Sequence, residues 1–362
     1  MKAKPTKKRW TRTEWLLLLA PLSIFAALIG WHSYSTYFMP RSFKCSGEVS
    51  AVSLSPNGKV LVSANNVALN VSELKFWRAK DGELLHETRL PFRSIESLDI
   101  ASDGNTVVAA CSDGRVRIWN LHSYQVQTTL KGHAADVFTA RYSANGKSVL
   151  SLGDEGRVLL WDCQKKRLTR ILSTKSAGIA GDISSDGKWV AYPRERSRKT
   201  RKTHYGTTEN YDLGGAIAVV DLKSNSTRQL SAELAREVRF SPDSRVMACL
   251  SEPQTTITSG DILTMFDVRT GRELWSRSGF RWRELTSLQF SPDSKIIAAQ
   301  GEKYQVHLWR ASDGKLLKTL SVFSLFNVSE STALSTSAIS FSADGKVLVS
   351  RYGDEIKLFR LN

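Results

Sequence analysis

The chain has 362 residues, of which 41% are hydrophobic and 24% are charged. This composition excludes a disordered chain, a fibrous repeat and a membrane protein with many spans. The formal net charge of +16 is concentrated in residues 2–14 and 194–202, which contribute +5 each. The remainder is only modestly basic, so the charge does not require a nucleic-acid-binding body.

An uncharged apolar stretch runs from Trp15 to Trp31, and the next charge after it is Arg41. A helix over this stretch spans ~25 Å, and residues 32–40 can extend it into the membrane interface. The preceding Lys and Arg residues are expected to stay in the cytoplasm. We therefore predict a basic cytoplasmic tail (1–14), a single transmembrane anchor (15–38) and an extracytoplasmic remainder, which is periplasmic in a bacterium.

Two other interpretations of the apolar stretch remain. A cleaved secretion signal has the same polarity, but it requires small residues at the cleavage site. The residues that follow the run, WHSYSTYFMP, are mostly bulky. The other interpretation is a buried helix of a soluble protein. We favour the uncleaved anchor.

A hairpin pattern recurs seven times after the anchor, and each copy has an apolar strand, a turn and a second apolar strand. Asn-Gly or Asp-Gly supplies the positive φ of the turn in most copies. In the two Pro-Asp-Ser copies we expect proline to preset φ instead. The copies span residues 54–63, 100–109, 142–151, 183–192, 240–249, 290–299 and 341–350.

A third strand follows every hairpin, and a fourth follows six of them. The third strands are expected at 73–77, 115–119, 157–161, 216–220, 262–266, 305–309 and 355–359. The fourth strands are expected at 82–90, 124–130, 166–172, 226–230, 271–277 and 314–320. Four antiparallel strands per ~42 residues are typical of a propeller blade, and blades must stack because one blade cannot bury both faces. We predict an all-β, seven-bladed β-propeller over residues 41–362.

The two ends of the repeat array are complementary. The seventh copy ends after its third strand, and an extra stretch, residues 41–46, precedes the first copy. We predict that this stretch supplies the outer strand of the seventh blade, which closes the ring and removes an exposed edge.

The repeats resemble those of the WD-repeat β-propellers, over about residues 43–362. The Trp-Asp pair of that family is intact at Trp161-Asp162 and varied elsewhere, as at Trp119-Asn120, and its Gly-His pair occurs once, at Gly132-His133. The resemblance implies a non-catalytic scaffold for protein–protein interactions.

The resemblance also implies a structural hydrogen-bond network within blade three. It would link His133 with Ser151 and Trp161. The acidic residue that completes such a network is either Asp154 or Glu155, and the sequence leaves both open.

Motifs for catalysis or cofactor binding are absent from the sequence. There is no Gly-x-Ser-x-Gly, no phosphate-binding Gly-x-x-x-x-Gly-Lys-Ser/Thr and no dinucleotide-binding glycine pattern. No Cys-x-x-Cys or Cys/His cluster with metal-ligand spacing occurs. Cys111 and Cys249 belong to different blades, so we expect buried apolar thiols rather than a disulfide. We predict no cofactor and no metal.

An exported propeller enzyme is the rival interpretation. Other seven-bladed propellers house lactonases and quinone-dependent dehydrogenases, whose active sites gather polar side chains at the central channel. We take one position of each first strand to be nearest the axis, and these positions are mostly apolar or small. The apolar or small ones are Val52, Leu98, Ala140, Val238, Leu288 and Ile339. This pattern argues against an axial active site.

The connection between the second and third strands is long in blade four (193–215) and in blade five (251–260). Such connections lie on one face of a propeller, so we expect a basic ridge there. Our candidates for partner binding are Arg194, Arg196, Arg198, Lys199, Arg201, Lys202, His204, Tyr205 and Tyr211. Loops of this length are functional or disordered, so a solvated loop without a partner is the alternative.

The charge of the ridge defines the kind of partner that we expect. An acidic protein surface or an anionic polymer is its complement, and anionic lipid headgroups also fit. Nucleic acid is not expected, because the predicted anchor exports this part of the chain.

Overall fold

The computed structural model describes residues 41–176, 179–194, 198–202, 208–212, 216–231, 234–252, 260–278, 280, 285–301, 305–321 and 338–361. The regular elements in these ranges are β-strands. No helix of this part of the chain is long and apolar enough to cross a bilayer. The predicted tail (1–14) and the predicted anchor (15–38) lie outside the described residues.

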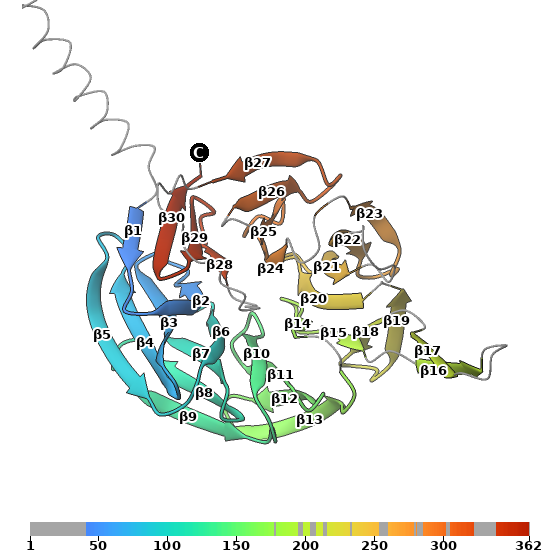
Figure 1. Ribbon diagram of the computed structural model, residues 1–362, viewed down its shortest axis with the longest axis horizontal. Helices are drawn as coiled ribbons and strands as arrows, with labels where there is room; N and C mark the ends of the chain where they lie inside the picture. The colour runs from blue at the N-terminus through green and yellow to red at the C-terminus, as the bar shows by residue number, and fades with distance from the viewer. Residues whose placement is uncertain are drawn as a thin grey trace, which may run out of the picture. The chain divides into compact units, whose positions relative to one another are not determined.

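The strands form seven four-stranded antiparallel sheets in a ring, with one strand of each sheet lining the centre (Figure 1). This confirms the predicted all-β, seven-bladed propeller. Blade one contains β2 (Glu48–Leu54), β3 (Val60–Ala68), β4 (Val71–Arg78) and β5 (Glu83–Leu90). Blade two contains β6 (Ile95–Ile100), β7 (Thr106–Cys111), β8 (Arg115–Asn120) and β9 (Val126–Lys131). Blade three contains β10 (Val137–Tyr142), β11 (Ser148–Gly153), β12 (Val158–Asp162) and β13 (Arg167–Ser173).

The remaining blades repeat this order from the inner strand to the outer strand. Blade four contains β14 (Asp182–Ile183), β15 (Trp189–Arg194), β18 (Ala216–Asp221) and β19 (Thr227–Ser231). Blade five contains β20 (Leu234–Phe240), β21 (Val246–Glu252), β22 (Ile262–Asp267) and β23 (Glu273–Arg277). Blade six contains β24 (Thr286–Phe290), β25 (Ile296–Gln300), β26 (Val306–Arg310) and β27 (Leu316–Leu320).

Blade seven is assembled from both ends of the ring. Its strands are β28 (Ile339–Phe341), β29 (Val347–Tyr352), β30 (Glu355–Arg360) and β1 (Arg41–Lys44). The order β1-β30-β29-β28 places β1 outermost, and Figure 1 shows the two ends of the colour scale side by side in this blade. The predicted closure by the stretch at residues 41–46 is therefore confirmed for the part that forms β1.

The hairpin turns show why the repeat motif recurs. In blade one, Ser55 Oγ accepts a hydrogen bond from Val60 N at 2.9 Å, and Gly58 has φ 65°. Ser244 and Ser294 occupy the same turn position in the Pro-Asp-Ser copies, with φ 59° and 62°. Our expectation that proline replaces the positive φ is therefore wrong, because serine itself adopts the left-handed conformation there.

The two serines also connect neighbouring turns. Ser244 Oγ accepts a hydrogen bond from Asp186 N at 3.1 Å, and Ser294 Oγ accepts one from Asp243 N at 3.1 Å. Each bond crosses from one blade to the next. The hydroxyl therefore provides an interaction that glycine would lack at this position.

Side chains connect the inner strands across every blade junction. An inner strand has an edge without a strand partner, so its backbone groups need other hydrogen-bond partners. Five side chains accept a hydrogen bond from a backbone N–H of the following blade, and Ser340 bonds back to blade one. The acceptor–donor pairs are Ser53–Ile100, Asp99–Tyr142, Asp182–Phe240, Glu237–Leu288, Ser287–Ala338 and Ser340–Leu54. Between blades three and four, Thr139 donates to the carbonyl of Ile179 at 2.8 Å.

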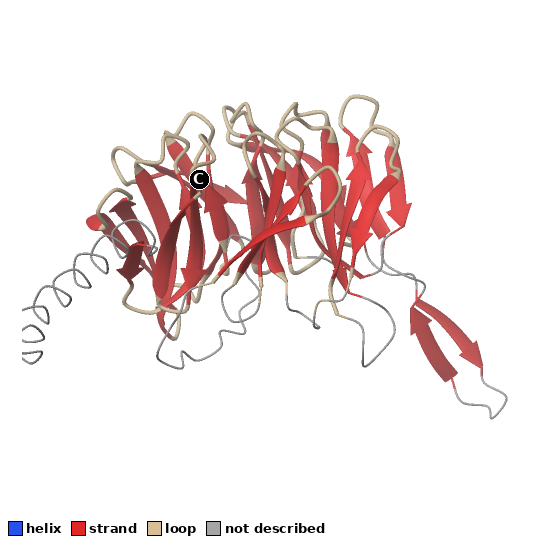
Figure 2. Cartoon of the chain, turned by 90° about the horizontal axis from the view of Figure 1, so that it is seen from above, coloured by secondary structure: helices blue, strands red, loops and turns tan. Residues whose placement is uncertain are grey.

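The blade-four insertion contains two further strands, β16 (Arg198–Lys202) and β17 (Thr208–Asp212). They pair antiparallel as a separate two-stranded sheet, seen apart from the blades in Figure 2. The strands β15 and β18 on either side pair directly with one another up to Arg194 and Ala216. The insertion therefore leaves the ladder of blade four intact.

Candidate functional site

A hydrogen-bonded chain of side chains crosses blade three. Trp161 Nε1 donates to Ser151 Oγ at 2.7 Å, and Ser151 Oγ lies 2.7 Å from His133 Nε2. His133 Nδ1 lies 2.6 Å from Glu155 Oε1. A carboxylate only accepts hydrogen bonds, so Nδ1 carries the proton and Nε2 accepts from the Ser151 hydroxyl. Of the two acids that the sequence left open, Glu155 is the one bonded to His133.

The surroundings of these hydrogen-bonded side chains indicate a structural role for them rather than a catalytic one. Their order of serine, imidazole and carboxylate resembles that of a hydrolase triad. However, Ser151 is fully buried, and its oxygen already accepts the indole N–H of Trp161. Burial lowers the pKa of His133, an effect that Glu155 partly opposes. The network therefore holds a neutral imidazole inside the blade, where the His133 side chain is only 1% exposed.

The candidate residues of the basic ridge lie in the blade-four insertion. Arg194 ends β15 and is exposed. Five others lie on the hairpin: Arg198, Lys199, Arg201 and Lys202 on β16 and Tyr211 opposite Lys199 on β17. Arg196, His204 and Tyr205 lie outside the described residues.

The apolar positions predicted to be nearest the axis do not line the channel. Leu98 is 1% exposed and packs in a core shared by blades one and two, and Ala140 lies in the core between blades two and three. The others, Val52, Val238, Leu288 and Ile339, are buried in the corresponding cores. The prediction that apolar side chains surround the axis is therefore wrong. These side chains face neighbouring blades, and the next residue along each of these strands is polar or charged.

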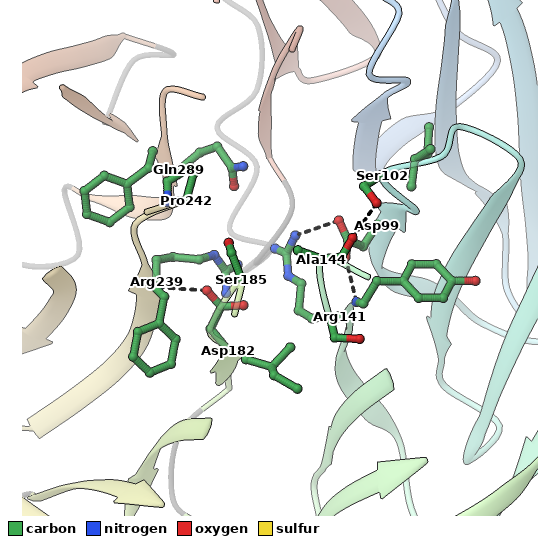
Figure 3. A pocket seen from close by; sticks show the side chains of 15 residues that line it. Asp99, Ser102, Arg141, Ala144, Asp182, Ser185, Arg239, Pro242 and Gln289 are labelled. Carbon is green, nitrogen blue, oxygen red and sulfur yellow. Dashed lines mark hydrogen bonds and ion pairs between the residues drawn. The ribbon is translucent and has the colours of Figure 1, made fainter. Parts of the chain in front are cut away.

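The channel instead opens into a polar cavity of about 280 Å³. First strands and turns of blades two to six line it, so it lies at the centre of the ring; we call it the channel-mouth cavity. Figure 3 shows four charged side chains around it: Asp99, Arg141, Asp182 and Arg239. They come from four consecutive blades, and their charges alternate in sign around the cavity.

Each carboxylate of the cavity has a fixed hydrogen bond. Asp99 Oδ2 accepts from Tyr142 N at 2.8 Å, and Asp182 Oδ2 accepts from Phe240 N at 2.8 Å. Asp99 Oδ1 lies 3.7 Å from Arg141 Nη1, an ion-pair distance that is too long for a hydrogen bond.

Burial shifts the ionisation of the cavity groups. It raises the pKa of Asp99 and of Asp182, which the nearby arginines partly oppose. Burial lowers the pKa of Arg141, and the positive charge of Arg239 acts in the same direction. Arg239 is only 3% exposed and forms an ion pair with Glu237 at 2.8 Å. These groups are thus held in a poorly solvated position, where charge interactions are strong.

The four charged residues of the cavity share one position in the repeat, and this could have been seen in the sequence. We instead took the apolar position directly before it to be nearest the axis. The four residues stand at one position of the repeat, directly before the residue that opens each hairpin copy. Reading that position around the ring gives Ser53, Asp99, Arg141, Asp182, Arg239, Gln289 and Ser340.

No cluster of three or more His, Cys, Asp or Glu side chains suited to a metal occurs among the described residues. The four cysteines are free, and Cys111 and Cys249 are fully buried as expected. Burial raises the pKa of Cys111 to about 12. These thiols therefore behave as apolar core residues.

Comparisons with known proteins agree with the fold. The family model described as "WD domain, G-beta repeat" matches residues 83–120 and 124–162, which contain much of blades two and three. The chain is thus a seven-bladed β-propeller in which two segments match the WD-repeat model.

The chain is also similar to several known proteins, one of which is named as a WD-repeat protein. The chain is 33% identical over 181 residues to WD repeat-containing protein SL1-17 of Schistosoma mansoni, covering 49% of this chain and 51% of that protein. It is 23% identical over 248 residues to Protein tipD of Dictyostelium discoideum, covering 61% and 40%. It is 23% identical over 246 residues to a serine-threonine kinase receptor-associated protein of Gallus gallus, covering 67% and 61%. The chain thus spans between 40% and 61% of the length of these relatives.

Proposed function

We propose that this propeller is a membrane-anchored scaffold that binds a protein partner through the blade-four insertion. The observation that carries the proposal is the hairpin of β16 and β17, which interrupts a blade whose own strands pair without it. An element that the fold does not need is available for another role.

The composition of the insertion indicates the chemistry of the partner. Six basic residues stand between positions 194 and 202, against one acidic residue, Glu195. A partner with an acidic surface would complement this charge and associate faster at low ionic strength. The WD repeats support a protein-interaction role, and one relative is named as receptor-associated.

The membrane part of the proposal rests on the apolar stretch and its basic flank. Only Met39 and Pro40 separate the predicted anchor from β1, the strand that closes the ring. We propose that the propeller is tethered at its closing blade and lies on the extracytoplasmic side.

The partner proposal is tested by cross-linking in native membranes. The variant replaces residues 195–215 with Ser-Asp-Gly, the connection that blade two uses between Cys111 and Arg115. Because β15 and β18 already pair, this change should leave the blade folded. We expect the intact chain to capture a protein that the shortened chain does not capture.

A second variant separates charge from shape. It keeps the hairpin and replaces the six basic residues at 194–202 with glutamine. Loss of capture in this variant too would support an acidic partner. Equal capture by the intact and shortened chains would contradict the proposed surface.

The topology is tested by protease protection in sealed vesicles or spheroplasts. A protease added from the extracytoplasmic side should degrade the propeller while sparing residues before the anchor. Complete protection of the propeller would contradict the proposed orientation, and release of the chain by alkaline carbonate would contradict the anchor.

A further inference from the structure

We propose that the channel-mouth cavity binds a small zwitterion of the size and charge of a free α-amino acid. The juxtaposition that carries this inference is the alternation of Asp99, Arg141, Asp182 and Arg239 around one cavity. The proposal is independent of the scaffold function, because none of the residues that line this cavity lies in the blade-four insertion.

The charge pattern selects the class of ligand. Two carboxylates and two guanidiniums line the cavity, so a ligand with one charge meets as many like charges as opposite ones. A ligand with an ammonium and a carboxylate a few ångströms apart can place each group against its complement. A free α-amino acid has this arrangement, and guanidinium–carboxylate contact is a strong form of recognition.

The charged groups are held in place before any ligand arrives. Asp99 and Asp182 each accept a backbone N–H from the next blade. Arg239 Nε donates to the carbonyl of Leu288 at 3.1 Å, while its Nη2 lies 2.8 Å from Glu237. Preorganisation of this kind reduces the entropy cost of binding.

The cavity also favours a ligand because its charges are poorly solvated. Arg141 is 8% exposed and Arg239 is 3% exposed, although both line an open cavity. Asp99 Oδ1 and Arg141 Nη1 lie 3.7 Å apart at this cavity. Opposite charges supplied by a ligand would offset the desolvation of these groups.

The size of the cavity limits the ligand. A volume of about 280 Å³ lies just below the range of pockets for drug-sized molecules. A single amino acid with a small or medium side chain fits this space.

Saturation-transfer NMR on the purified full chain in detergent tests the proposal. The probes are glycine, L-alanine and L-glutamine, with acetate and methylammonium as ligands that carry one charge. We expect at least one amino acid to bind saturably below about 10 mM, and acetate and methylammonium to bind at least about tenfold more weakly. Absence of saturation for all three amino acids, or equal binding of acetate, would overturn the proposal.

Variants assign the binding to the cavity. Arg141→Gln and Asp182→Asn should each weaken amino-acid binding at least about tenfold, since each removes one charged contact. Asp136→Asn is the control, because Asp136 pairs with Arg93 outside the cavity. Binding that is unchanged in both cavity variants would overturn the assignment.

A further variant tests the site without replacing any of the four charged residues of the channel-mouth cavity. Ala144 is exposed and lines the cavity, so Ala144→Phe should cover the cavity without changing any charge. We expect this variant to melt at the temperature of the unmodified protein and to lose amino-acid binding. Full binding in Ala144→Phe would place the site elsewhere and overturn the proposal.

Discussion

Nδ1–H of His133 donates a hydrogen bond to Oε1 of Glu155, 2.6 Å away, and burial favours the neutral imidazole. Since burial lowers the pKa of His133 below its ordinary value of 6.5, the unfolded chain binds a proton at a higher pH than the folded chain does. The stabilisation by neutral His133 is therefore fully present above about pH 6.5 and decreases below it, by at most about 1.4 kcal/mol per pH unit. The free energy of unfolding in urea at pH 7.5 and 5.5 measures this.

A variant attributes the pH effect to this residue. His133→Asn should show a smaller loss of stability between the two pH values than the unmodified chain. The exposed His122 provides the control, and His122→Asn should retain the full loss. Identical pH dependence in all three proteins would contradict the assignment.

The hydroxyl of Ser151 joins two buried groups. Ser151→Ala would leave Trp161 Nε1 and His133 Nε2 without their shared partner, at a cost of about 2–4 kcal/mol in the free energy of unfolding. Urea unfolding at pH 7.5 measures the difference. A loss below about 0.5 kcal/mol, the usual scale of a neutral substitution, would contradict the role of the network.

Blade two provides the reverse experiment. Ala109 stands where blade three has Ser151, and among the described residues nothing accepts a hydrogen bond from the buried Nε1 of Trp119. Ala109→Ser should supply this acceptor and raise the free energy of unfolding by about 1 kcal/mol. Ala110→Ser, at the adjacent buried position, should lower it. If both substitutions destabilise the protein, the added hydroxyl at position 109 does not satisfy Trp119 Nε1 and the prediction is wrong.

The fold could be predicted because its signals are local and repeated. Each copy carries a turn motif with a defined φ, and apolar alternation marks the strands on both sides. The closing strand followed from counting, because a seventh blade without a fourth strand needs one from residues 41–46. The turns and strands depend on residues that are close together in the sequence, so they can be predicted without knowing the fold.

The charged cavity depends on register, which the sequence does not show directly. A β-bulge interrupts most inner strands, as between Ile95 and Ser97 in β6, so simple alternation cannot identify the residues that face the channel. The apolar pattern selects Leu98, but its neighbour Asp99 lines the cavity. Similarly, the choice between Asp154 and Glu155 depends on the geometry of a turn in which Gly156 has φ 80°.

Substitutions at Ser294, one of the two turn serines, test how much the hydrogen bond between neighbouring hairpin turns stabilises the ring. Ser294 combines a left-handed φ with a hydrogen bond from Asp243 N of the preceding blade. Ser294→Ala loses the bond and keeps the backbone strain, so the free energy of unfolding should fall by about 1–2 kcal/mol. Ser294→Gly also loses the bond but relieves the strain, so the free energy of unfolding should fall by less in this variant. A larger loss for glycine than for alanine, measured by urea unfolding, would contradict this explanation.

The closing strand makes a specific contact with blade one. Phe43 of β1 is 7% exposed, stacks on Trp77 with ring centroids 6.2 Å apart, and covers Gly82, where an added Cβ would lie 2.5 Å from the ring. Phe43→Ala removes this contact and should cost about 3–5 kcal/mol, which a thermal melt will register as a lower midpoint. Deletion of residues 41–46 removes the whole strand and should lower the midpoint further. Leu84→Ala, on the outer strand of blade one at 43% exposure, is the control and should change stability far less. An unchanged melting temperature after the deletion would mean that the ring does not depend on β1 for its closure.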